Sequence, residues 1–373
     1  MDRLNKNREP FLRIAKRTDI TPFRVYATRI IAVLLSLVVS GIFIFAVTKL
    51  NPVDVYKSLF AGAFGTKRRF WVTIRDTMML LCIALGLAPA FKMRFWNIGA
   101  EGQVLIGGIV TAGLMRSLGS SLPLPVLLVL MAAGSFLGGA VWGAIPAFFK
   151  AFWNANETLF TLMMNYVAIQ LTSYCVALWE NPFGSNSVGI INQKTKAGWF
   201  PAIFGQQNTL NVIIVLLLTV AMFLYLKSSK QGFEIAVVGS SEKTARYVGI
   251  NVKAVMIRTV ALSGAICGIA GFIAVAGASH TISTSTAGGQ GFTAIIVAWL
   301  AKFNPFIMVV ISLLLVSLQK GATQIASQFN LNDYASSVIT GIILFFILGS
   351  EFFIRFRLIV RGKKENSKGG AKA

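Results

Sequence analysis

The chain has 373 residues, of which 55% are hydrophobic and only 13% are charged, and its mean hydropathy is +0.70. Soluble domains average about 25% charged residues, so a soluble protein of this composition could not cover its surface with ionised groups. The formal net charge of +22 does not indicate a nucleic-acid partner, because Lys and Arg gather at the chain ends and in one central loop rather than along an aromatic-interleaved face. The composition therefore predicts a protein embedded in a lipid bilayer.

About ten apolar segments fit membrane-spanning helices, although the eighth is short and is expected to continue into the glycine-rich stretch before it. They cover residues 30–48, 73–90, 98–117, 125–149, 158–179, 209–226, 256–277, 290–301, 304–320 and 336–354. With the N-terminus inside, 25 of the 35 Lys and Arg residues lie on the cytoplasmic side and 10 lie outside. This excess of positive charge predicts that both termini are cytoplasmic.

The chain divides into three parts on this topology. Residues 1–29 are a basic cytoplasmic segment, residues 30–355 form the transmembrane domain, and residues 356–373 are a basic cytoplasmic tail whose low-complexity composition predicts disorder. Two connections within the domain are too long for simple turns. One is a cytoplasmic loop over 227–255, and the other is an extracytoplasmic loop over 180–208.

Two apolar segments are expected to be interrupted helices, because glycine and polar residues fall where a span should begin. The first interruption is Asn97–Gln103 (NIGAEGQ) and the second is Ala287–Phe292 (AGGQGF). Broken backbone survives at membrane depth only where protein or water surrounds it. The first opens an outward-running span and the second an inward-running one, so the pattern predicts inverted repeats that meet at a midplane pathway.

Glu101 is an ionisable residue near the start of a membrane helix, where it is costly unless it is paired or hydrated. It either lines a solute pathway or satisfies the free N–H groups at the start of its half-helix, where the helix dipole also favours a carboxylate. Thr158, Thr161 and Asn165 form a polar stripe at helical spacing on the fifth span. The stripe either lines a water-filled route or hydrogen-bonds to neighbouring helices.

The sequence indicates no catalytic or metal site. The single histidine, His280, lies in a Ser/Thr/Gly-rich stretch and is expected to be a loop residue rather than a proton relay. Ser-His-Asp, Walker A and HExxH patterns are absent, so the chain does not hydrolyse ATP itself. Glycines at GxxxG spacing, Gly134, Gly138, Gly139 and Gly143 on the fourth span and Gly264 and Gly268 on the seventh, predict close helix packing.

The cytoplasmic loop contains a short helix signal. Ser241 fits an N-cap before Glu242-Lys243-Thr244-Ala245-Arg246, and Gly249 fits the stop. Such a helix beneath the membrane would be a rigid lever for a soluble partner. The alternative is an ordinary surface loop.

Four separated stretches resemble a known family. GFEIAVVGSSEKTARYVGIN (232–251) is similar to the coupling segment of permease subunits in bacterial ATP-binding-cassette (ABC) importers for branched-chain amino acids, simple sugars and nucleosides. FWNIGAEGQ (95–103), NETLFTLMMNY (156–166) and GQGFTAIIVAWLAKFNP (289–305) resemble the nucleoside sub-branch. Trp96, where a smaller residue is common, and Trp299 and Lys302, in place of Leu and Arg, depart from its pattern.

The resemblance implies an all-α polytopic protein of the type II importer permease fold, with about ten transmembrane helices per subunit, in the bacterial cytoplasmic membrane. Two permeases, here expected to be distinct homologous chains, would enclose the pathway, with ABC ATPase subunits carrying ATP and magnesium below and a substrate-binding lipoprotein outside. No cofactor is expected on this chain.

The resemblance also implies residue roles. The contacts to the ATPase would fall on Gly239, Ser240, Glu242, Ala245, Arg246 and Gly249. The substrate pathway would involve Asn97, Glu101, Gln103, Thr161 and Asn165.

The sequence therefore predicts a transport subunit that carries a purine or pyrimidine nucleoside, driven by ATP hydrolysis on partner subunits. A permease for a simple sugar or a branched-chain amino acid is the nearest alternative. An ion-coupled secondary transporter also fits interrupted helices, although it needs intramembrane carboxylates, of which the chain has few. A membrane-embedded enzyme is disfavoured because no nucleophile–base or metal set is present.

Overall fold

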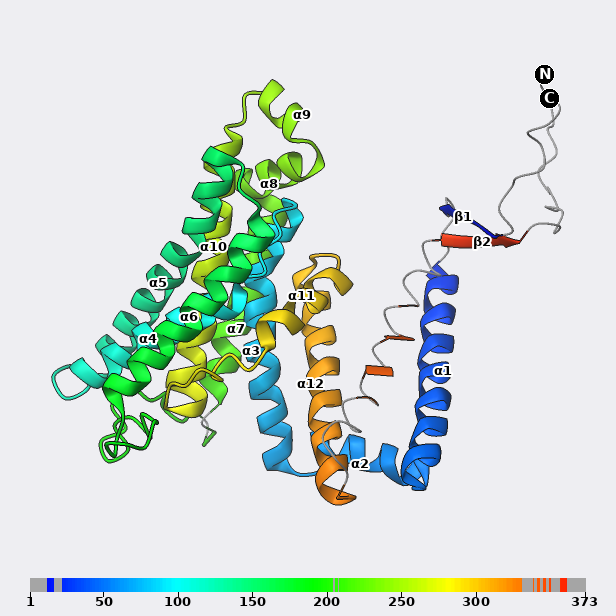
Figure 1. Cartoon of the computed structure of the whole chain (residues 1–373), viewed down its shortest axis with the longest axis horizontal. Helices are drawn as coiled ribbons and strands as arrows, with labels where there is room; N and C mark the ends of the chain where they lie inside the picture. Colours follow the sequence, from blue (N-terminus) through cyan, green and yellow to red (C-terminus); the bar gives the residue numbers. More distant parts are fainter. Residues whose placement is uncertain are drawn as a thin grey trace. The chain divides into compact units, whose positions relative to one another are not determined.

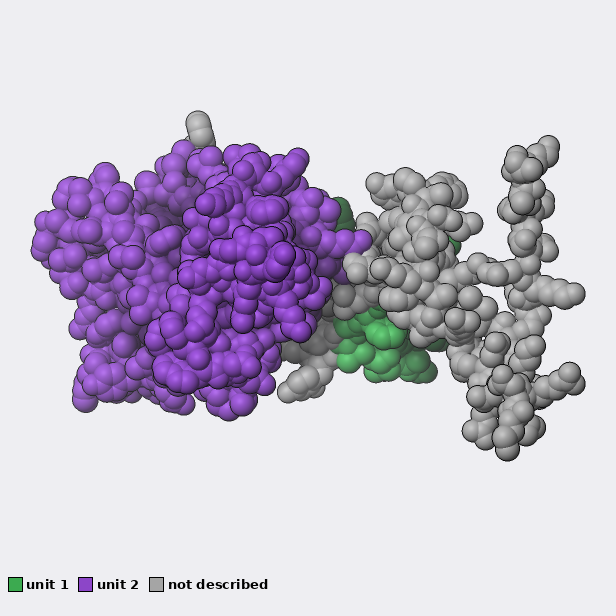
Figure 2. Space-filling view, turned by 90° about the horizontal axis from the view of Figure 1, so that it is seen from above, with its two compact units in different colours: residues 1–62, 318–373 green, residues 63–317 purple. Residues whose placement is uncertain are grey.

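In the computed structural model of the protein, the residues described are 12–16, 22–203, 205–206, 208–330, 338, 341–342, 345–346, 349 and 356–360. They belong to two compact units, residues 1–62 with 318–373 and residues 63–317 (Figure 2). The second unit contains both predicted interruptions and the cytoplasmic loop. It is therefore the unit that matters for function.

The described elements are helical except for one pair of short strands (Figure 1). The helices are α1 (Pro22–Thr48), α2 (Pro52–Phe64), α3 (Lys67–Lys92), α4 (Ala100–Leu118), α5 (Leu124–Trp153), α6 (Glu157–Trp179), α7 (Thr209–Ser228), α8 (Lys230–Ser240), α9 (Glu242–Tyr247), α10 (Val252–Phe272), η1 (Ile273–Ser279), α11 (Gln290–Leu300) and α12 (Pro305–Gln328). The strands β1 (Leu12–Lys16) and β2 (Phe356–Val360) pair antiparallel. An all-α chain was predicted, so this pair is a departure. The rest of the tail, residues 361–373, lies outside the described residues.

Six helices of the described chain are long and apolar enough to cross a membrane, and the bent pair Leu34–Thr48 with Pro52–Phe64 adds a seventh. The six are α3, α5, α6, α7, α10 continued by η1, and α12. Helices also occupy the predicted spans at 98–117 and 290–301, while the predicted span at 336–354 falls mostly outside the described residues. The structure thus bears out a multi-span helical protein, whereas the count of about ten spans stays a prediction.

The sequence did not predict helix α2, which follows a 109° bend after α1. Asp54 and Lys57 interrupt the apolar pattern of this segment, so it was not expected to be a span. The two side chains form an ion pair of 3.8 Å on the exposed surface of the helix. The side chain of Tyr56 hydrogen-bonds to Ser40 on α1 at 2.9 Å. This contact between the two arms of the bend shows why a short, partly polar helix is stable at this position.

The core of the second unit is α10, a largely buried helix that packs against α3, α4 and α5. Close packing is possible because its glycines face the glycines of its neighbours. A Cβ atom on Gly139 of α5 would overlap the carbonyl oxygen of Gly264, and one on Gly268 would overlap that of Ser135. The predicted role of the GxxxG spacings on α5 and α10 is therefore confirmed.

Replacing Gly139 with Ala should force α5 and α10 apart, because the added methyl group meets backbone that cannot rotate away. We expect a loss of about 1–3 kcal/mol in the free energy of unfolding, measured as a lower heat-denaturation midpoint of the purified protein in detergent. Gly113→Ala is the matched control, because the nearest atom to its new Cβ is a Trp179 ring carbon at 3.4 Å. Equal midpoints for the two variants would contradict this account of the core.

Candidate functional site

The break between α3 and α4 is held by a cluster of buried amide side chains. Asn97 Nδ2 donates a hydrogen bond to Ser263 Oγ of α10 at 3.0 Å. Asn97 Oδ1 accepts from the N–H of Gly99 at 3.0 Å and from Gln103 Nε2 at 3.3 Å. Asn97 and Gln103 are essentially inaccessible to solvent. Two of the predicted pathway residues therefore fix the irregular backbone in place.

Helix α6 supplies the rest of the support for this break. Asn165 Oδ1 accepts from the N–H of Gly102 at 2.9 Å, and its Nδ2 donates to the carbonyl of Ile98 at 2.9 Å. Thr161 Oγ1 accepts from the N–H of Ile98 at 3.2 Å. Of the two alternatives for the polar stripe, hydrogen bonding to a neighbouring helix is the one seen here. Each bond satisfies a backbone group that the interruption leaves without a helical partner.

Glu101 joins the two interrupted helices to each other. Its side chain is in the first turn of α4 and only 8% exposed. Oε1 accepts from the N–H of Gly289 at 2.7 Å and Oε2 from the N–H of Gly291 at 2.8 Å. These amides form the N-terminus of α11, where the helix dipole favours negative charge. The carboxylate does satisfy free N–H groups, but those of α11 rather than of its own helix.

The five predicted pathway residues, Asn97, Glu101, Gln103, Thr161 and Asn165, are thus brought together around one break and buried. Their polar atoms are committed to the protein's own backbone and to one another. Contact with a substrate remains a prediction for all five.

The predicted cytoplasmic helix is present as α9. Ser241 Oγ accepts from the N–H of Thr244 at 3.2 Å, which is the expected N-cap contact, and Gly249 follows the helix at φ +81°. Ala245 is fully buried in a cluster with Phe95 of the α3–α4 break and Val255 of α10. A short helix with one buried face and several exposed residues can transmit a displacement.

Helix α8 connects α9 to the membrane-spanning core. A Cβ on Gly239 would overlap the carbonyl oxygen of Lys92 at the end of α3, so the two backbones touch. Glu234 of α8 also pairs with Arg258 of α10, with 2.6 Å between Oε2 and the guanidinium. Helix α8 is therefore attached to the core at two points, and the contact with Lys92 lies just before the break at Asn97.

The six predicted coupling residues separate into two groups by exposure. Gly239 and Ala245 are buried and serve the attachment. The exposed ones are Ser240, Glu242, Arg246 and Gly249. Sequence reasoning missed Tyr247 and Val248, which are 92% and 60% exposed at the tip of the lever. The sequence pattern that could have identified them is a pair of bulky residues at the end of a short helix, of which only Ala245 is buried.

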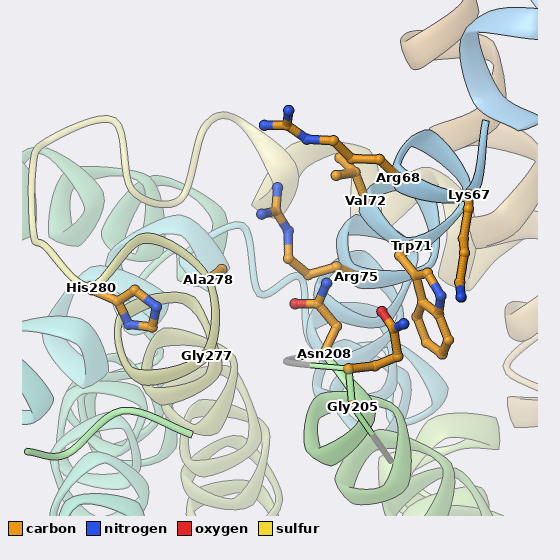
Figure 3. Close-up of a pocket in the computed structure, with 11 residues that line it drawn as sticks. Lys67, Arg68, Trp71, Val72, Arg75, Gly205, Asn208, Gly277, Ala278 and His280 are labelled. Carbon is orange, nitrogen blue, oxygen red and sulfur yellow. The ribbon is translucent and has the colours of Figure 1, made fainter. Parts of the chain in front are cut away.

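A cationic pocket of about 690 Å³ opens at the other end of α3, on the side that the charge distribution assigns to the outside (Figure 3). It is lined by Lys67, Arg68, Trp71, Val72, Arg75, Gly205, Gln206, Asn208, Gly277, Ala278 and His280. Arg75 forms an ion pair of 2.8 Å with Asp76, while Figure 3 shows Arg68 and Arg75 extending in the same direction. The pocket suits a negatively charged group of a partner.

His280 belongs to the wall of this pocket rather than to a proton route. Its ring stacks on Trp199 at 3.8 Å between centroids and 3° between planes. Burial lowers the pKa of the imidazole below its usual range. Hydrogen bonding to the backbone opposes this effect, and the nearby charge of Arg75 adds to it. The stack ties the loop after η1 to the loop of residues 180–208.

No group of three or more His, Cys, Asp or Glu side chains that could hold a metal ion occurs among the residues described. Within the same residues, Cys82 and Cys267 are buried free thiols and Cys175 is half-buried. The candidate functional features of the described chain are the two backbone breaks, the α8–α9 segment and the cationic pocket.

Residues 71–348 match the family described as branched-chain amino acid transport system, permease component. The chain belongs to this family. Similar proteins include the glucose ABC transporter permease protein of Haloferax volcanii, 27% identical over 93% of this chain and 93% of that protein. The guanosine ABC transporter permease protein NupP of Bacillus subtilis is 29% identical over 88% of this chain and 94% of that protein. The nucleoside ABC transporter permease protein NupB of Lactococcus lactis is 27% identical over 93% of this chain and 99% of that protein.

Among solved structures, one described as an inward-facing conformation of a metal-chelate type ABC transporter is similar to this chain, with a TM-score of 0.46 and 15% sequence identity. The match covers 89% of this chain and 100% of the other. Family membership makes this chain a multi-pass permease of the cytoplasmic membrane and a transport subunit rather than an enzyme. ABC permeases of this family work with an ATPase and other components of their transporter.

For this permease, Glu101→Gln should destabilise the folded protein. A neutral amide accepts from one of the two N–H groups and turns its own NH₂ toward the other, so we expect a loss of about 2 kcal/mol in the free energy of unfolding. Heat denaturation in detergent measures it. Glu180→Gln is the control, because Glu180 accepts from Gly184 and Asn186 in an exposed loop. Unchanged stability with lost transport would instead favour a pathway role for Glu101.

Proposed function

We propose that the chain forms half of the translocation pathway of an ATP-driven importer for purine or pyrimidine nucleosides. Its partners would be a second, distinct permease, an ABC ATPase that binds ATP and magnesium, and an external substrate-binding lipoprotein. The chain itself would alternate between outward-open and inward-open states. ATP binding and hydrolysis on the partner would supply the free energy that shifts the population.

The observation that carries this proposal is the attachment of α9 to the broken segment. Exposed side chains at the tip of α9 are available to a soluble partner. Gly239 of α8 touches the backbone of Lys92, and Ala245 packs in one cluster with Phe95. A push on α9 would therefore reach the α3–α4 break through close-packed backbone rather than through flexible side chains.

The substrate assignment depends on the relatives. Permeases named for guanosine and for nucleosides match this chain over most of their length, as does one named for glucose. The three motifs that resemble the nucleoside sub-branch, at 95–103, 156–166 and 289–305, favour a nucleoside. A sugar is the second candidate, on the strength of the glucose relative.

Ion-coupled transport is disfavoured by the state of the acidic residues. Every Asp and Glu in the described ranges has a partner in the protein. Asp54, Asp76, Glu157, Glu234 and Glu242 pair with Lys or Arg, and Glu101 and Glu180 accept backbone N–H groups. Glu351, a further candidate, lies outside those ranges. Proton coupling in particular needs an intramembrane carboxylate that is free to take up and release the proton.

The lipoprotein would dock over the cationic pocket. Lys67, Arg68 and Arg75 of α3 line that pocket, and complementary acidic residues on the lipoprotein would accelerate docking and fix its orientation. The substrate would then be released toward the interrupted helices below.

Cells that express the complete transporter should take up radiolabelled nucleosides, and unlabelled nucleosides should compete while glucose should not. Uptake should stop when ATP is depleted and continue when the proton and sodium gradients are collapsed, because the energy comes from the ATPase. Competition by glucose would make the protein a sugar permease, whereas dependence on a gradient would make it a secondary transporter.

Arg246→Ala combined with Tyr247→Ala should lower nucleoside uptake at least about tenfold, because Arg and Tyr are enriched among the interface residues whose truncation costs about 2 kcal/mol or more. Both side chains are exposed, so the amount of protein in the membrane should not change. The control is Lys230→Ala with Phe233→Ala, an exposed cation and an aromatic residue on α8. Normal uptake with the α9 pair, or an equal loss with the α8 pair, would argue against α9 as the contact.

A further inference from the structure

Four aromatic rings gather at the cytoplasmic ends of α3 and α11. Trp96 and Trp299 are stacked, with 5.4 Å between centroids and 24° between planes. Phe91 lies 5.9 Å from Trp96 and 6.0 Å from Trp299, and Phe303 lies 5.2 Å from Trp299. Helices α3 and α11 pack against each other in the same unit (Figure 1). The cluster is thus built from the two elements that the interruptions create.

Helices α3 and α11, beside which the two tryptophans lie, end with the same type of backbone turn. The N–H of Phe95 donates to the carbonyl of Ala90 at 3.0 Å, and that of Phe303 donates to Ala298 at 3.1 Å. Each of these wide turns follows a residue with positive φ, Arg94 at 64° and Lys302 at 51°. Both helices therefore end in a Schellman-type cap, which fixes the direction of the chain beside each indole ring.

The stacked pair remains accessible although most polar residues around the break are buried. Trp96 is 46% exposed and Trp299 is 44% exposed, and Trp96 directly precedes the buried Asn97. The two indole rings contact each other, Phe91 and Phe303, and they are not among the side chains that hydrogen-bond to the backbone of the break.

We propose that Trp96 and Trp299 form a stacking platform for the heteroaromatic base of the transported nucleoside on the cytoplasmic side of the interrupted helices. This rests on the proposed function and names how its cargo is held. Aromatic side chains bind purines and pyrimidines alike, because every base has a π-face. The surrounding polar groups are committed to the backbone, so stacking is the recognition chemistry available here.

The test uses the purified transporter, without lipoprotein, in lipid nanodiscs. Adding adenosine or uridine should quench tryptophan fluorescence, and ribose, which has no base, should not. Trp96→Leu with Trp299→Leu keeps apolar bulk but removes the π-faces, and should weaken the apparent affinity about tenfold. The same positions changed to Phe retain π-faces and should lose less, which separates stacking from misfolding.

Trp153→Leu is the matched control. Trp153 is 65% exposed at the end of α5, on the side assigned to the cytoplasm, in a separate aromatic cluster. An equal loss there would make Trp96 and Trp299 ordinary interfacial tryptophans in contact with lipid. Absent quenching, equal quenching by ribose, or unchanged affinity in the Leu pair would overturn the platform. Failed nucleoside uptake by the unaltered cells would overturn the proposed function separately, and the platform with it.

Discussion

The carboxylate of Glu101, bound to the N–H groups of Gly289 and Gly291, is the interaction on which the architecture of the second unit depends. Both interruptions are predicted to lie at membrane depth, where a backbone N–H without a partner costs several kcal/mol. One side chain from the first interrupted helix satisfies the second, so the two breaks must lie side by side. The negative charge is tolerated because two amides and the dipole of α11 surround it.

This arrangement makes the interrupted helices a mechanical pair. A displacement of α9 would reach the end of α3 through Gly239 and Lys92, the break through Asn97, and α11 through Glu101. Close-packed backbone and buried hydrogen bonds have few intermediate arrangements, so such a connection favours two discrete states over gradual bending. The glycine contacts join α10 to α5 and also to α4, and the hydrogen bond from Asn97 to Ser263 attaches the break to the same helix.

The sequence predicted the features that a local pattern defines and missed those that depend on tertiary contacts. Ser241 and Gly249 marked the ends of α9, and the GxxxG spacing marked the contact of α5 with α10. The partner of Glu101 lies 188 residues away, so no local pattern could identify it. Helix α2 was missed because it depends on a tertiary contact, that of Tyr56 with Ser40. The π-helical turn η1 continues the predicted span at 256–277, and no local pattern marked its geometry.

The polar side chains around the break form hydrogen bonds within the protein, and this limits how the permease can recognise its substrate. Asn97, Gln103 and Asn165 have both ends of their amides engaged. Rotating Asn97 or Asn165 toward a solute would leave a buried backbone group unpaired, and rotating Gln103 would break its hydrogen bonds to the side chain of Asn97. Selection by hydrogen bonding would then fall to a soluble receptor, which can bury polar groups around a ligand in water. What remains for the pathway is weak, adaptable contact, and stacked indoles satisfy that need because they bind without demanding a fixed orientation.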